Sequence, residues 1–208
     1  MNLASTTSKE RTLAFIALGV VYIVWGSTYV GIRLVVEHMP PFIAAAIRFL
    51  LAGGALLLFT RVAGQWKAPT REQWRNAALV GILLMGIGNG LIMWAQKSIP
   101  SGITALLVAT FPLWLTLAEA LMSRGASLRL PVVSGVAVGL VGVFLIASAK
   151  GDVSFSGAGT PVLALIAVQA ASICWTIGYI KAKSIKDRLP LVMASGLEMT
   201  SGGIFLLL

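Results

Sequence analysis

A few charged and polar side chains lie inside long apolar segments of this 208-residue chain. They are Arg48, Asn89, Glu119 and Glu198. A charged group that faces lipid near the centre of a membrane costs about 2.5–3.5 kcal/mol, so Arg48 and Glu198 are expected to point into the protein. There they could bind a polar small molecule, and the carboxylates could also carry protons.

Arg48 and Glu198 occupy equivalent positions of an internal repeat, with opposite charge. The repeat is marked by Trp25, Tyr29 and Pro40, which recur 150 residues later as Trp175, Tyr179 and Pro190. Each charge lies eight residues beyond its proline, about 12 Å along a helix. We expect Arg48 and Glu198 to be two-fold-related poles of one cavity, attracting a carboxylate and an ammonium group. A structural ion pair, or bonding of Arg48 to loop carbonyls, is the alternative.

The other polar groups also have two readings. Glu119 lies near the end of its apolar segment, where it either extends to the membrane surface or titrates in coupling to protons. Glu198 is the second candidate for proton coupling. Asn89 stands between Gly88 and Gly90, so its amide either joins helices or contacts a substrate.

Duplicated aromatic side chains accompany these groups. Trp25 and Tyr29 of the first copy, with Trp175 and Tyr179 of the second, are expected to line an amphipathic cavity or its gate. Pro112, inside the fourth apolar segment, is expected to kink a helix there.

The composition defines the medium that these groups work in. The chain is 58% hydrophobic and 11% charged, with a mean hydropathy of +0.92, which indicates an integral membrane protein. Its net charge of +9 comes from short loops rather than from a basic face, which argues against nucleic-acid binding. No phosphate-binding, metal-ligand or catalytic motif is present, so we expect no cofactor, no metal and no catalytic site.

Hydropathy predicts seven membrane-spanning helices, at 13–36, 41–60, 77–96, 102–122, 131–149, 158–180 and 190–208. Prolines at or near several of their starts fit this division. Twelve lysine and arginine residues fall on the side of the N-terminus and three on the other side. Because cytoplasmic loops carry the excess of basic residues, the N-terminus is expected in the cytoplasm.

These spans predict an all-α polytopic membrane protein built from inverted repeats. A cytoplasmic tail (1–12) precedes a first repeat of five helices (13–149), and a second repeat begins at 158 and continues to 208. Since five is an odd number, the second copy enters the membrane from the opposite face. The last span ends within an apolar run, which suggests that about three further helices are missing.

The motifs, in this order, resemble the EamA repeat of the drug/metabolite transporter superfamily. The resemblance rests on Trp25-Gly26-Ser27-Thr28-Tyr29, Pro40-Pro41, Arg48-Phe49, Gly88-Asn89-Gly90, Pro100-Ser101-Gly102, Ala109-Thr110-Phe111-Pro112-Leu113 and the series Gly135, Gly139 and Gly142. It implies ten helices in two inverted five-helix repeats around a central cavity. It further implies export of small metabolites, amino acids or drug-like compounds across the bacterial inner membrane. The glycine series is expected to pack helices closely, and in this architecture such packing is compatible with a homodimer.

The leading hypothesis is therefore a secondary transporter that works by alternating access, with a small-molecule substrate and the lipid bilayer as its partners. A membrane-embedded enzyme or a non-transporting membrane scaffold is the alternative. An enzyme would have to use Glu119 or Glu198, since His38 is the only histidine and falls in a loop.

Overall fold

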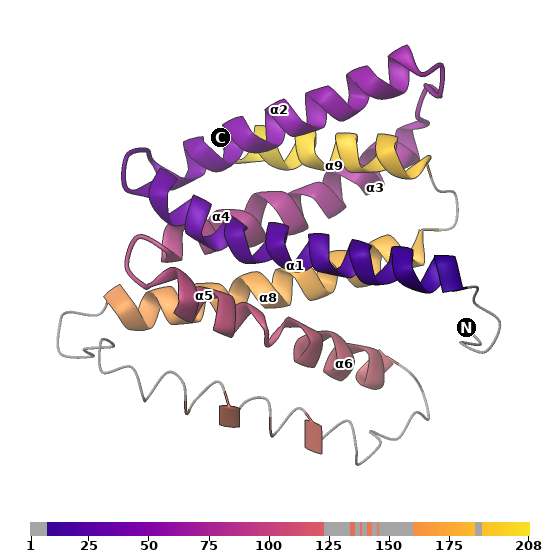
Figure 1. Cartoon of the computed structure of the whole chain (residues 1–208). Coiled ribbons are helices and arrows are strands. Elements are labelled where there is room, and N and C mark those ends of the chain that lie inside the picture. The colour runs from indigo at the N-terminus through magenta and orange to yellow at the C-terminus, as the bar shows by residue number, and fades with distance from the viewer. Residues whose placement is uncertain are drawn as a thin grey trace.

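The computed structural model describes residues 8–122, 134–135, 138, 141–142, 145, 160–185 and 189–208, and the regular elements in these ranges are all helices (Figure 1). Five helical stretches are long and apolar enough to cross a membrane: Thr12–Val36, Pro41–Val62, Arg71–Ala95, Ser101–Met122 and Val162–Ser184. The prediction of an all-α polytopic membrane protein is confirmed.

Prolines begin three of the helices, as the sequence indicated. The first helix, α1 (Ser8–Val36), ends in a short turn before Pro40, the N-cap of α2 (Pro41–Val62). Pro100 and Pro190 cap α5 (Ser101–Val108) and α9 (Leu191–Phe205) in the same way. Proline suits these positions because its missing N–H would have no helical partner there.

The third span differs from its prediction at its start and in its middle. Its first part, α3 (Arg71–Gly81), begins six residues before the predicted 77, because Thr70 and Gln73 form a capping box. A π-helical segment, η2 (Ile82–Gly88), follows and leads into α4 (Asn89–Ala95). The third span is therefore helical, as expected, but it is not one uninterrupted α-helix. π-helical turns of this kind are frequent at functional sites.

The fourth span is broken rather than merely kinked. It consists of α5 and α6 (Phe111–Met122), joined through Ala109 and Thr110. Pro112 is the second residue of α6, and it has no N–H to bond back to the preceding turn. The Thr110 hydroxyl instead donates to the carbonyl of Leu107, at 2.6 Å.

The last described helices follow the prediction with shifted ends. The sixth predicted span, 158–180, is α8 (Thr160–Ser184), and the seventh, 190–208, is α9. Most of the fifth predicted span, 131–149, lies outside the described residues, and so does Gly139 of the glycine series. A methyl group added to Gly135 or Gly142 would meet nothing within 4 Å, so the expected close helix packing is not seen at these two glycines among the described residues.

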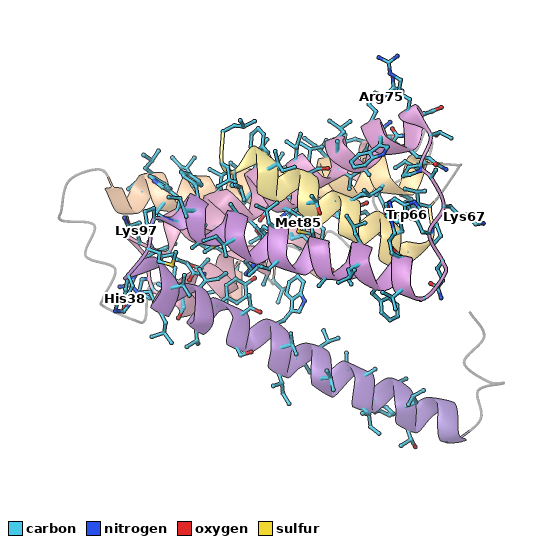
Figure 2. All side chains as sticks on the ribbon, turned by 90° about the horizontal axis from the view of Figure 1, so that it is seen from above. His38, Trp66, Lys67, Arg75, Met85 and Lys97 are labelled. Atoms are coloured by element: carbon cyan, nitrogen blue, oxygen red, sulfur yellow. The ribbon has the colours of Figure 1, made fainter. Side chains whose placement is uncertain are left out.

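The helices are stacked side by side, and the third span lies in the middle (Figure 1). On one side α9 packs against α3 and η2, with α2 beyond it; on the other side α8 packs against η2 and α4 and also contacts α5 and α6. Helix α1 joins the bundle near its C-terminal end, where Ile32 and Val36 are buried. Its N-terminal part diverges from the other helices (Figure 2).

The equivalent helices of the two repeats, α2 and α9, pack against each other with two-fold symmetry. A methyl group added to Gly53 would lie 2.9 Å from the Gly196 carbonyl oxygen, and one added to Gly203 would lie 3.2 Å from that of Ala46. The 150-residue offset converts one contact into the other, since 53 becomes 203 and 46 becomes 196. Residue numbers rise along α2 as they fall along α9, so the two copies run in opposite directions. The repeats are inverted.

This close approach predicts how alanine substitution affects the two helices. Gly53→Ala should lower the free energy of unfolding by about 1–3 kcal/mol, because the new methyl group would press on the backbone of α9. At neighbouring Gly54 an added methyl group would meet nothing within 4 Å, so Gly54→Ala should be neutral or slightly stabilising. Unfolding of both variants in detergent micelles checks this. Equal stability of the two would contradict the packing.

Candidate functional site

A cavity of about 480 Å³ lies within the bundle and is lined by helices of both repeats. This volume is typical of sites that hold small molecules. Met85, one of its lining residues, is labelled near the middle of the bundle in Figure 2. The lining residues are Trp25, Thr28, Tyr29, Ile32, Arg48, Phe49, Ala52, Leu84, Met85, Asn89, Ile92, Phe111, Trp175, Tyr179 and Met199.

Helical spacing explains why the duplicated aromatic residues share this cavity. In α1, Trp25 and Tyr29 are four residues apart and so lie on one face, and Trp175 and Tyr179 repeat that spacing in α8. All four line the cavity. The structure thus brings together the aromatic side chains that the sequence singled out.

Arg48 is the charged residue that lines the cavity among those the structure describes. Its Nη2 donates a hydrogen bond to Asn89 Oδ1, at 3.1 Å. Its guanidinium carbon lies 4.4 Å from the centre of the Phe49 ring, so the group is also held by a cation–π contact. These two contacts fix the guanidinium group at the cavity wall.

The Asn89 amide is held in turn by the π-helical segment. Its Nδ2 donates to the Leu84 carbonyl oxygen at 2.9 Å, and the indole Nε1 of Trp175 donates to the same oxygen at 2.8 Å. Leu84 lies within η2, where the wider turn shifts the usual backbone bonding by one residue. One backbone carbonyl therefore joins α8 to the Arg48–Asn89 pair.

Glycine lets Trp175 reach this carbonyl. A methyl group added to Gly88 would collide with the Trp175 indole nitrogen. On its other side the indole meets Phe111 edge-on, with ring centres 6.1 Å apart. The indole is thus placed by η2 and by the start of α6, directly after the break in the fourth span.

Trp25, the repeat equivalent of Trp175, has a different environment. Its side chain is 58% exposed, and it has no recorded hydrogen-bond partner among the described residues. The two repeats therefore both carry a tryptophan here, but only the Trp175 indole has a recorded hydrogen bond among the described residues.

Glu198 does not meet Arg48 in this structure. It lines a second pocket of about 310 Å³, with Gln73 and Asn76 of α3 and residues at the ends of α8 and α9. The expectation of one cavity with two opposite poles is not met in this arrangement. Arg48 and Glu198 occupy equivalent positions on α2 and α9, which are related by the two-fold symmetry. They nevertheless line two separate pockets.

Glu119 lies on neither pocket. Its Oε1 accepts a hydrogen bond from Lys183 Nζ at 2.7 Å, and both side chains are well exposed. This contact is an ion pair between α6 and the end of α8.

Gln169 is a polar residue of α8 that was not among the residues predicted to be functional. Its Oε1 accepts hydrogen bonds from Thr110 Oγ1 and from Trp114 Nε1, both at 3.0 Å. Its Nε2 lies 3.5 Å from the Leu107 carbonyl oxygen. Gln169 therefore holds together the two halves of the broken fourth span. The sequence did offer a signal, because Gln169 is a polar residue inside a predicted apolar span and a buried amide needs hydrogen-bond partners.

Among the described residues, no group of three or more His, Cys, Asp and Glu side chains could hold a metal ion. The arrangement offers a binding chamber instead: an apolar, aromatic wall with one fixed cation. Such a chamber can select and orient a small molecule.

The shared carbonyl predicts different effects for the two duplicated tryptophans. Trp175→Phe should lower the free energy of unfolding by about 1 kcal/mol, because it removes a donor from Leu84. Trp25→Phe should cost clearly less, since its indole has no recorded partner. Thermal unfolding in micelles provides the comparison, and a larger loss for Trp25→Phe would refute this reading.

The amino-acid sequence is similar to those of known membrane transporters. The profile of the EamA-like transporter family matches residues 12–148. The inner membrane transporter YedA of Escherichia coli K12 is 39% identical over 196 residues, covering 93% of this chain and 60% of YedA. The transporter YvbV of Bacillus subtilis is 27% identical over 206 residues, covering 96% of this chain and 63% of YvbV.

A probable amino-acid metabolite efflux pump of Salmonella typhimurium is 26% identical over 184 residues, covering 87% of this chain and 56% of the pump. No solved structure matches the chain. The chain therefore spans about 60% of the length of YedA. Together with its apolar helices, the likeness to YedA indicates a multi-pass inner membrane protein. The chain belongs to the EamA-like transporter family.

Proposed function

We propose that the protein acts as a secondary transporter that exports small metabolites, amino acids or drug-like compounds across the bacterial inner membrane. The observation that carries the proposal is the cavity of about 480 Å³, which is lined by helices of both inverted repeats. Transporters of this construction bind their substrate at the interface of the repeats. The family and the names of its relatives support the same reading.

Alternating access would move the repeats about this cavity. The third span crosses the middle of the bundle, and its π-helical segment contacts both α8 and α9 of the second repeat. A change in the η2 bonding pattern would therefore act on both neighbours at once. The direction of export is inferred from the efflux pump of Salmonella typhimurium, whose name states it.

The orientation that we propose has the N-terminus in the cytoplasm. Trp66, Lys67 and Arg75 lie at one end of the bundle, and His38 and Lys97 lie at the other (Figure 2). The first end belongs to the side that collects most of the basic residues.

A membrane-impermeant maleimide applied to cells should label Lys97→Cys and not Lys67→Cys, and the reverse pattern would reject this orientation.

For proton coupling, Glu198 is the better of the two candidates. It lines a pocket of its own, whereas Glu119 is engaged in an exposed ion pair with Lys183. A carboxylate that lines a pocket inside a membrane protein is a common place for a transported proton to bind. We propose that Glu198 carries it.

Counterflow in vesicles tests the transport function. The protein is reconstituted into liposomes loaded with unlabelled phenylalanine, 3-phenylpropionate or 3-phenylpropylamine, and uptake of the labelled compound is followed. A carrier gives saturable counterflow of at least one of these probes. Flux that rises without saturation would indicate a channel, and no flux above empty liposomes would contradict transport.

The same vesicles test the role of Glu198. For a transported probe, an imposed pH gradient should accelerate flux in the wild type and in Glu119→Gln. In Glu198→Gln the acceleration should be lost while counterflow persists, because exchange needs no net proton movement. Gradient-driven flux of wild-type size in Glu198→Gln would remove this residue from the coupling mechanism.

A further inference from the structure

The charge in the central cavity has only one sign among the described residues. Arg48 lines the cavity, and no carboxylate does. Glu198, the carboxylate that was expected opposite Arg48, lines the second pocket instead. The recorded ion pairs in the described part of the chain are Arg33 with Glu37 and Glu119 with Lys183, so Arg48 has no protein counter-ion there.

Arg48 keeps donor groups available. A guanidinium group has five N–H donors, and the recorded side-chain bond to Asn89 Oδ1 uses one of them. Its cation–π contact with the Phe49 ring holds the group without using a donor. Two parallel N–H groups of arginine match the two oxygens of a carboxylate, and this bidentate contact is among the strong hydrogen bonds in proteins.

The place next to Arg48 is unfavourable for a second cation. Arg48 is positively charged, and no carboxylate among the described residues lines the cavity to offset it. An ammonium group brought next to Arg48 would be repelled by the guanidinium charge, and the nearby oxygens of Asn89 and Leu84 already accept hydrogen bonds from the protein. The amino group of an amino acid lies one carbon away from its carboxylate, so it would have to enter the same unfavourable place.

The rest of the cavity suits an apolar body. Trp25, Tyr29, Phe111, Trp175 and Met199 surround the space beside the guanidinium group. Aromatic walls contribute burial and edge or face contacts to rings. A ligand that is complementary to this cavity would therefore have a flat or apolar body with one negative charge at one end.

We propose that the central cavity binds a small organic anion, a carboxylate on an aromatic or apolar body, in preference to the corresponding zwitterion or cation. Arg48 pairs with the carboxylate, and the aromatic side chains surround the body. This assignment rests on the proposed transport function and narrows its substrate class.

Four ligands with the same phenylpropyl body test the assignment by isothermal titration calorimetry of the purified full chain in micelles at pH 7. They are 3-phenylpropionate (an anion), 3-phenylpropanamide (neutral), 3-phenylpropylamine (a cation) and phenylalanine (a zwitterion). The anion should bind at least about tenfold more tightly than each of the other three, because it alone can form a hydrogen-bonded charge pair with Arg48 that no positive charge of the ligand opposes.

Variants locate the preference. In Arg48→Gln the advantage of the anion over the neutral amide should fall below about threefold, and Arg48→Lys should restore part of it, since charge is kept and the fork is lost. Arg61→Gln is the matched control: Arg61 lies on the same helix, stacks on Trp66 and does not line the cavity. It should keep the full advantage.

The outcomes separate the two levels of the proposal. Equal or tighter binding of phenylalanine or of the amine overturns the anion assignment and leaves a carrier of other compounds. An undiminished advantage in a folded Arg48→Gln protein overturns the role of Arg48. Absence of saturable binding by all four ligands counts against the assignment and the transport site together. If Arg48→Gln does not fold, the wild-type ligand series decides.

Discussion

The arrangement of the cavity depends on one backbone carbonyl, that of Leu84. The π-helical segment of the third span presents this oxygen to Asn89 and Trp175 together. Asn89 in turn orients Arg48, and Trp175 brings α8 of the second repeat against the first. Sharing one acceptor between two donors holds both part-buried side chains in place, because each would lose a hydrogen bond if it moved away from this oxygen.

A second constraint is the contact between the equivalent helices of the two repeats. Small residues at Gly53, Gly196 and Gly203 let the backbones of α2 and α9 approach closely. In a membrane the hydrophobic effect does not drive helices together, because lipid is as apolar as their side chains. Close backbone packing must therefore supply much of the attraction between them. The glycines thus hold the repeats together at their symmetry axis, while the polar contacts of Leu84 define the chamber beside it.

The sequence predicted the helical class, most of the spans and the duplicated aromatic wall, because hydropathy and the 150-residue offset report on position directly. It did not predict the π-helical segment, because no local residue pattern distinguishes it from an α-helix, whereas its close packing at Gly88 against Trp175 involves residues far apart in the sequence. Nor could it place Arg48 and Glu198, since equal depth along two related helices does not determine which cavity each side chain enters. The extra turn before 77 was readable from Thr70 and Gln73.

If a small molecule occupies the cavity beside Arg48, it should protect a cysteine on the cavity wall from chemical labelling. In a background with Cys174→Ser, Ala52→Cys places a thiol on the cavity wall, and Gly54→Cys places one outside it. A saturating ligand that is bound in the cavity should slow maleimide labelling at position 52 several-fold and leave labelling at position 54 unchanged. Unchanged labelling at position 52, with a ligand that demonstrably binds, would mean that the ligand does not bind in this cavity.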